Sequence, residues 1–118
     1  MGLCKPAHRS LLPQHFSEHH FSEYGFCASP ALTLAAVAPV TNNIRLGTGI
    51  TVLPLNHPLR LAEEIALLDL ISDGRGDFGV GRGFQPIEYR GFHVDQSHSH
   101  ENAVMRAPMP TGAAPSCG

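Results

Sequence analysis

The chain has 118 residues, a formal net charge of -2 at pH 7 and a hydrophobic content of 42%. This size allows one small domain or part of a larger one, and the apolar fraction is too high for a disordered segment. The near-neutral charge excludes a basic nucleic-acid-binding surface, and no apolar run reaches the roughly 18 residues of a membrane span. We therefore expect neither a nucleic acid nor a membrane as a partner.

Composition divides the chain into three zones. Residues 1–14 are a short basic and apolar mixture, and residues 15–102 have the pattern of a globular domain. Residues 103–118 are rich in Ala, Pro and Gly and are expected to form a flexible tail. Three widely spaced cysteines fit neither a disulfide framework nor a paired zinc motif, and the start has no apolar leader. We expect a reduced, cytoplasmic location.

The first predicted elements of the globular zone are a helix and a strand. Ser29 is suited to cap a helix whose first residue is Pro30, and a helix is predicted over 31–40. That segment is apolar nearly all round, which indicates cover on more than one side. After a turn, β-branched residues predict a strand over 44–53, and its internal glycines favour a bulge or a closely approaching ligand.

A second helix and a second strand follow. Residues 59–71 place Leu61, Ile65 and Leu68 on one helical face, and Gly74 is positioned to cap the helix end. A short strand is predicted over 77–81. Because the crossover between the two strands is long and holds a helix, the strands should be parallel, in an α/β fold. Two or three parallel strands make an incomplete sheet, since parallel sheets need cover on both faces.

Two histidine clusters are candidates for chemistry. In the first, Glu18, His19 and His20 suit general acid–base work near neutral pH or metal binding, although adjacent histidines on a strand point in different directions. A polar loop without function is the alternative. The second, from His98 to Glu101, is expected to be a solvated loop, because structural zinc sites show paired ligand spacings. A metal-binding module would use the histidines at positions 15, 19, 20, 98 and 100.

A glycine-rich run follows the last predicted strand. Gly79 to Gly83 leaves the carboxyl end of that strand, where α/β folds place ligands. Glycines let the backbone approach a phosphate or a flat ring, and Arg82 is suited to hold an anion. A tight turn with a solvated arginine is the alternative at this point.

Several separated segments, in order and at the right spacing, resemble the bacterial luciferase-like monooxygenases. They are EHHFSEYGFCASP, IRLGTGITVLPLNHPLRLAEEIALLDLISDGRGDFGVGRGF and EYRGF. The resemblance covers residues 15–101. It implies that the chain forms about units 2–4 of a (β/α)8 TIM barrel, with parallel strands and outer helices.

The resemblance also implies a reaction and its cofactor. Family members are flavin-dependent oxidoreductases in which reduced FMN and O2 oxidise a small organic substrate such as an aldehyde or an alkane. A flavin reductase would supply the reduced FMN, and one branch of the family uses the deazaflavin F420 instead. These features imply a monooxygenase with no metal at its site.

Site residues are implied one by one. His19 lies where the family has its catalytic histidine, and Glu18 precedes it. A base near neutral pH suits the handling of protons in this chemistry. Gly49 and Ile50 match a place where the family can have a non-proline cis peptide under the flavin ring.

The glycine-rich run gains a specific meaning from the resemblance. Arg82 matches an arginine that contacts the flavin phosphate, and Gly81 and Gly83 flank it as cofactor-binding residues. Gly81 stands where bacterial luciferase has a reactive cysteine. With no thiol at that position, nothing in the sequence favours light emission.

The length of the chain differs from that of the family. A complete barrel takes about 250 residues, and strands one and five to eight have no counterpart in this sequence. The alternative to an active monooxygenase is therefore a truncated, non-catalytic remnant of the family. In relatives the second and third barrel helices pack into a dimer, so the helices near 31–40 and 59–71 are the expected interface.

Overall fold

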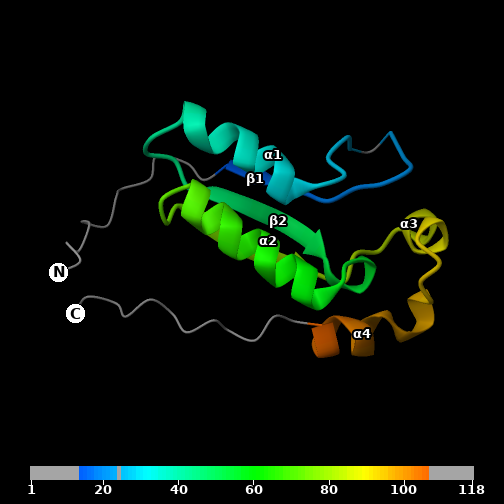
Figure 1. Cartoon of the computed structure of the whole chain (residues 1–118). Coiled ribbons are helices and arrows are strands. Elements are labelled where there is room, and N and C mark those ends of the chain that lie inside the picture. Colours follow the sequence, from blue (N-terminus) through cyan, green and yellow to red (C-terminus); the bar gives the residue numbers. More distant parts are fainter. Residues whose placement is uncertain (1–13, 24, 107–118) are drawn as a thin grey trace.

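Three strands form one parallel sheet in a computed structural model that describes residues 14–23 and 25–106. The expected N-terminal segment lies almost wholly outside these residues, as does the expected tail from residue 107 on. The sheet order is β1-β2-β3, so strands that follow one another in the chain are neighbours. The first two, β1 and β2, are labelled behind the helices in Figure 1. The strands are β1 (Gln14–Phe16), β2 (Leu46–Val52) and β3 (Gly76–Gly81). The predicted parallel α/β arrangement is confirmed.

The pairing of β2 with β3 is irregular in its middle. The register shifts between Thr48 and Thr51, which confirms the bulge expected near the strand glycines. At the shift, the Thr48 hydroxyl donates to the Gly79 carbonyl over 2.6 Å and accepts from the Gly79 amide over 2.9 Å. A Cβ on Gly79 would overlap the carbonyl oxygen of Thr48, so this close approach requires glycine.

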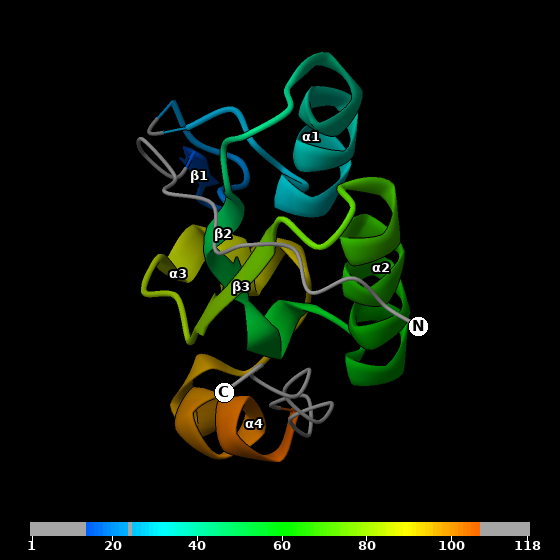
Figure 2. The same ribbon diagram turned by 90° about the vertical axis from the view of Figure 1, so that its left-hand side faces the viewer.

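Two helices cover the same face of the sheet (Figure 2). They are α1 (Pro30–Val37), which continues into the 3-10 turn η1 (Ala38–Val40), and α2 (Pro58–Ile71). Ser29 caps α1 as predicted, because its hydroxyl accepts from the Leu32 amide over 3.3 Å. The core lies between these helices and the sheet, and its buried members are Leu34, Ala38, Leu46 and Leu68.

Arg75 joins the turn after α2 to the first helix and to β2. Its guanidinium donates to the carbonyls of Ala38 at 2.7 Å, Ile44 at 3.1 Å and Ser72 at 2.9 Å. Arg75 thereby links the turn after α2 to the start of η1 and to the segment that precedes β2. Just before it, Gly74 has a φ of +76° and its amide donates to the Asp69 carbonyl, so the predicted left-handed cap is confirmed.

Short helices follow each of the last two strands. They are the 3-10 turn η2 (Leu53–Leu55), α3 (Pro86–Gly91), the 3-10 turn η3 (Gln96–His98) and α4 (Ser99–Arg106). Residues 98–101 are largely exposed, as expected, but the loop predicted there is wrong because they end η3 and begin α4. The domain end expected at residue 102 falls inside α4. Asp95 starts this helical region by accepting from the Ser97 amide over 2.8 Å, and Ser99 is buried. No helix in the described part of the chain is long and apolar enough to cross a membrane.

Candidate active site

A pocket of about 290 Å³ lies where the carboxyl ends of the three strands meet. Ligands of α/β folds bind at this end of the sheet. The pocket therefore brings together most of the residues singled out in the sequence, although Gly81 and Arg82 are not among those that line it. The lining residues are Ser17, Glu18, His19, Gly49, Ile50, Val52, Gly83, Phe84 and Glu88.

The backbone at Gly49 and Ile50 forms one wall of the pocket. The peptide bond between them is cis, at the place that the resemblance implied. Both carbonyls are bound by the chain that leaves β1: the Ser17 hydroxyl donates to the Gly49 carbonyl, and the Glu18 amide donates to the Ile50 carbonyl over 2.9 Å. The end of β1 thus fixes this wall.

Glu18 is buried, and both of its carboxylate oxygens accept hydrogen bonds. Oε2 accepts from the Val52 amide over 2.6 Å, and Oε1 contacts Nε2 of His20 at 2.8 Å. The Asn56 side-chain amide lies 3.1–3.2 Å from the two oxygens. A buried carboxylate with this many donors is well compensated for its lost hydration. Glu18 therefore ties the ends of β1 and β2 together.

The side chains of His19 and His20 have different neighbours. The His20 ring packs edge-on against Phe92, with 4.6 Å between ring centroids. The His19 ring is mostly buried, with 18% of its side chain exposed, and its Nδ1 faces α3. Only His19 of the two lines the pocket, so the structure separates the roles of the two histidines.

Glu88 is a site residue that the sequence reasoning missed. Its carboxylate is 1% exposed, and its Oε1 accepts from the His20 amide over 2.9 Å and lies 3.4 Å from Nδ1 of His19. The usable signal was Pro86, which is suited to the first position of a helix and would place Glu88 in its first turn. Nothing in the sequence indicated that this turn packs against residues 68 positions away.

The loop after β3 adjoins the pocket through its glycines. Gly83 has a φ of +73°, and a Cβ there would lie 2.8 Å from Val52 Cγ1, so both backbone conformation and space call for glycine. Arg82 is exposed. Its carbonyl accepts from the hydroxyl of Tyr89, and burial raises the pKa of that hydroxyl.

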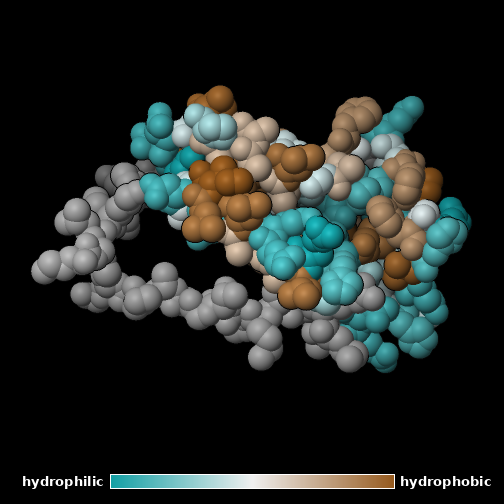
Figure 3. All heavy atoms as spheres, viewed as in Figure 1, coloured by the Kyte–Doolittle hydropathy of each residue, from teal (hydrophilic) through white to brown (hydrophobic). Residues whose placement is uncertain are grey.

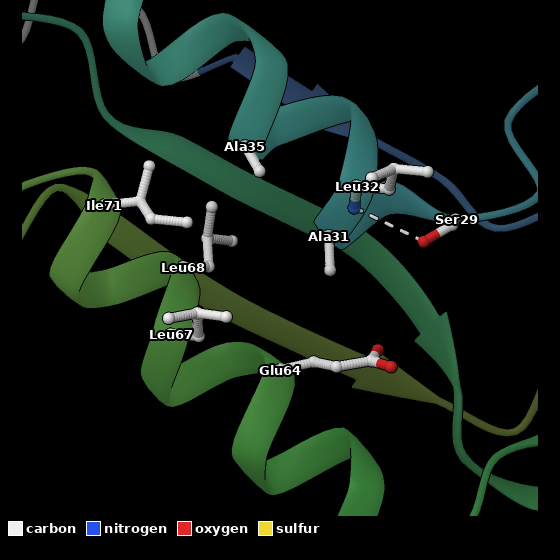
Figure 4. Close-up of a pocket in the computed structure, with 8 residues that line it drawn as sticks. All are labelled: Ser29, Ala31, Leu32, Ala35, Glu64, Leu67, Leu68 and Ile71. Atoms are coloured by element: carbon white, nitrogen blue, oxygen red, sulfur yellow. Dashed lines mark hydrogen bonds between the residues drawn. The ribbon is translucent and has the colours of Figure 1, made fainter.

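A second hollow, also of about 290 Å³, lies between α1 and α2. Hydrophobic residues gather on this side of the molecule (Figure 3), and Leu32, Leu67 and Ile71 are 73%, 56% and 47% exposed. Figure 4 shows both helices directing apolar side chains into the groove, with Ser29 and Glu64 as polar members. The predicted need for further cover on these helices is thus not met within the described residues.

The histidines do not form a metal site in the described part of the chain. Within residues 14–23 and 25–106, no three His, Cys, Asp or Glu side chains are placed to share an ion. Among these residues, His98 makes only exposed contacts with carboxylates, at 3.9 Å to Asp95 and 3.6 Å to Glu101. The alternative of a metal-binding module built on five histidines is therefore not supported.

Comparisons with known proteins agree with these observations. The family model described as Luciferase-like monooxygenase matches residues 15–106. The chain is 40% identical over 84 residues to the alkanal monooxygenase alpha chain of the Kryptophanaron alfredi symbiont, covering 71% of this chain and 24% of the relative. It is 41% identical over 88 residues to the oxygenase component of a flavin-dependent trigonelline monooxygenase from Acinetobacter baylyi, covering 74% and 24%.

A solved structure gives the same result for the fold. The oxygenating constituent of 3,6-diketocamphane monooxygenase from Pseudomonas putida, a type II Baeyer–Villiger monooxygenase in complex with FMN, superposes with a TM-score of 0.73 at 26% identity. The match covers 78% of this chain and 27% of that one. The chain thus spans about a quarter of the length of the curated relatives that it matches.

Proposed function

The chain belongs to the luciferase-like monooxygenase family and folds as part of its (β/α)8 barrel, and we therefore propose that it supplies one side of the flavin site of a monooxygenase. In this reaction reduced FMN and O2 oxidise a small organic substrate. The observation that carries the proposal is the pocket at the strand ends, where His19, the Gly49–Ile50 wall and Gly83 come together.

The pocket fits part of a flavin. Its volume of about 290 Å³ is just below the roughly 300–1,000 Å³ of ligand sites, which suits a ring system held from one side. Gly49 and Gly83 let a flat ring approach the backbone, and Ile50 and Val52 offer apolar surface. Reduced FMN supplies the electrons that activate O2. The deazaflavin F420 is the alternative cofactor, and a titration with each distinguishes the two.

Residues of the chain have separate roles in proton transfer, in positioning and in phosphate binding. His19 acts as the base that holds and moves a proton at the edge of the pocket. Glu18, whose oxygens are occupied by hydrogen bonds, acts by positioning the ends of β1 and β2 rather than by exchanging protons. Arg82 contacts the flavin phosphate, and Gly81 and Gly83 keep the loop around it close to the strand ends.

Two protein partners are part of the proposal. A second copy of the chain covers the apolar groove between α1 and α2, because that groove exposes several large side chains. A flavin reductase supplies the reduced cofactor in the cytoplasm. The relative from Acinetobacter baylyi is called an oxygenase component, which favours a separate source of electrons.

Arg82→Ala is expected to weaken FMN binding about tenfold while leaving riboflavin binding unchanged. Riboflavin lacks the phosphate, and a charge-assisted contact between arginine and phosphate contributes about 1.5–3 kcal/mol, less where water screens it. The measurement is a fluorescence titration of the full 118-residue chain with each flavin.

Arg90→Ala is the matched control, because Arg90 is another exposed arginine nearby on α3. It should leave both affinities unchanged. Equal losses for FMN and riboflavin in Arg82→Ala would remove the phosphate role. A wild-type chain that binds neither FMN nor F420 would contradict the flavin site itself and favour the non-catalytic remnant.

A further inference from the structure

Two side chains contact Nδ1 of His19, one from α3 and one from the residue that precedes α3. Nδ1 lies 3.4 Å from Oε1 of Glu88 and 3.3 Å from Nε2 of Gln85. We propose that Glu88 is a positioning residue that keeps the neutral His19 ring in the tautomer with its proton on Nδ1. The inference rests on the proposed function, in which His19 is the base of the flavin pocket.

The burial of Glu88 is the first step of the argument. The residue is 1% exposed, so its carboxylate has lost nearly all of its hydration and depends on protein donors. An ionised carboxylate has room for about four donors and can only accept. The His20 amide provides one donor at 2.9 Å. An N–H at Nδ1 of His19 would provide another on the same oxygen, Oε1.

The distance between Nδ1 of His19 and Oε1 of Glu88 is consistent with a hydrogen bond that shortens when a ligand binds. At 3.4 Å, the separation between Nδ1 and Oε1 is longer than the 2.7–3.2 Å of a well-formed hydrogen bond. Hydrogen bonds of reactive groups are commonly long before a ligand binds and shorten in the complex. In the complex, we expect the His19 ring to move toward Oε1, which the His20 amide already holds.

Gln85 does not oppose this arrangement. A glutamine side chain can turn either its amide nitrogen or its carbonyl oxygen toward a neighbour, whereas an ionised carboxylate can only accept. Hydrogen bonds to a charged group are roughly twice as strong as neutral ones. Glu88 therefore decides the position of the proton, and Gln85 adapts its orientation to it.

The consequence concerns the other ring nitrogen. A proton fixed on Nδ1 leaves the basic lone pair on Nε2, so His19 accepts protons there. The orientation of a catalytic histidine by a carboxylate at one ring nitrogen is a general way to prepare the other for proton transfer. In this chain the preparation comes from α3, which begins 67 residues after His19 in the sequence.

The direct test is the tautomer of His19 in the wild-type chain. The full 118-residue protein is labelled with 15N in its histidine rings, and two-bond 1H–15N spectra are recorded at a pH where His19 is neutral. His19→Gln assigns the signals. We expect the proton on Nδ1, the form that free histidine favours less. A ring with its proton mainly on Nε2 would overturn the inference without any variant of Glu88.

Variants identify which neighbour sets the tautomer. Glu88→Gln keeps an acceptor for the His20 amide but removes the charge, and it should move the tautomer ratio about fivefold toward Nε2–H. Gln85→Leu should retain Nδ1–H. An unchanged ratio in Glu88→Gln, or a switch in Gln85→Leu, would overturn the assignment. Glu101→Gln is the matched control, since Glu101 faces Nδ1 of His98 at 3.6 Å on the surface; it should leave the His19 signals unchanged.

A parallel FMN titration separates this inference from the function on which it rests. A chain that binds FMN but holds His19 as Nε2–H would overturn the role of Glu88 and leave the flavin site standing. A chain with Nδ1–H that binds no flavin would overturn the proposed function and leave the contact of Glu88 with His19 in place.

Discussion

Ile50 packs closely against Gly81, next to the pocket wall that Gly49 and Ile50 form. A Cβ on Gly81 would overlap Cδ1 of Ile50 and lie 3.3 Å from its Cγ1. The tip of Ile50 therefore fills the position where a residue with a side chain, such as the cysteine of bacterial luciferase, would project. A residue as large as isoleucine therefore fits at position 50 only because position 81 is glycine.

Gly81→Ala is expected to destabilise the chain by about 1 kcal/mol, the lower end of the cost of overpacking, because the tip of Ile50 can move aside. Ile50→Val removes only the overlapping Cδ1. The double variant Gly81→Ala with Ile50→Val should therefore be more stable than the sum of the two single changes predicts. The measurement is urea unfolding of the four chains followed by circular dichroism.

Gly76→Ala is the control, because it lies on the same strand and its Cβ would meet Asp69 Oδ1 at an ordinary 3.5 Å. It should be close to neutral. If Gly81→Ala costs no more than this control, or if Ile50→Val offsets none of the loss, the packing argument is refuted.

Individual site residues were predictable to different degrees. His19, Glu18 and the Gly49–Ile50 pair stand in segments whose resemblance to a family is visible in the sequence, and they meet in one pocket. Their roles stay predictions. Glu88 stands in the resembling segment EYRGF but was not singled out, because its contact with residues 19 and 20 arises only when α3 folds back on the end of β1. Spacing along the chain carries no signal for such a contact.

At the scale of secondary-structure elements, an ion pair between Arg45 and Asp77 links the start of β2 to β3. Arg45 precedes β2, and its Nε donates to Oδ2 of Asp77 over 2.7 Å, while a second nitrogen contacts Oδ1. These hydrogen bonds hold the pKa of Asp77 below its ordinary value. The side chains are 41% and 42% exposed, so water screens the pair and its contribution is at most about 1 kcal/mol.

Arg45→Gln is expected to flatten the acid side of the stability profile. Because the pKa of Asp77 is lower in the folded chain than in the unfolded chain, its contribution is fully present above the ordinary aspartate pKa of about 3.9 and is lost as the pH falls through the folded value. The measurement is the free energy of unfolding between about pH 6 and pH 3.

Arg60→Gln, an exposed arginine on α2, is the control and should keep the wild-type slope. If the free energy of unfolding has the same pH dependence in Arg45→Gln and in the wild-type chain, the ion pair does not lower the pKa of Asp77.

Elements with a strong internal pattern were predictable, and those that depend on tertiary contacts were not. The helix predicted over 59–71 is observed as α2 from Pro58 to Ile71, because its apolar residues repeat at helical spacing. The six residues of α3 are too few to show a period. The start of α4 was assigned to a loop, because Ser99 becomes buried only through contacts made in the folded chain.

At the scale of the whole molecule, the described residues expose an apolar groove between α1 and α2. We expect the wild-type chain to dimerise there, because α1 and α2 present Leu32, Leu67 and Ile71 to solvent around one hollow. Leu67→Glu should weaken the dimer at least about tenfold, since burying a leucine contributes about 1.5–3 kcal/mol and a carboxylate resists desolvation. Sedimentation velocity measures the effect.

Leu59→Glu is the matched control, because Leu59 is similarly exposed on the same helix and does not line the groove. It should dimerise like the wild-type chain. A monomeric wild-type chain, or equal weakening by both variants, would contradict an interface centred on this groove.

The bulge in β2 changes which side chains can share a wall. In a regular strand, consecutive side chains face opposite sides of the sheet. The extra residue between Thr48 and Thr51 shifts the alternation by one step, and Gly49, Ile50 and Val52 all reach the same cavity. Deleting one residue there would restore an even ladder to the sheet and remove part of the pocket wall. In this segment, the register shift in β2 therefore helps to determine which residues form the site.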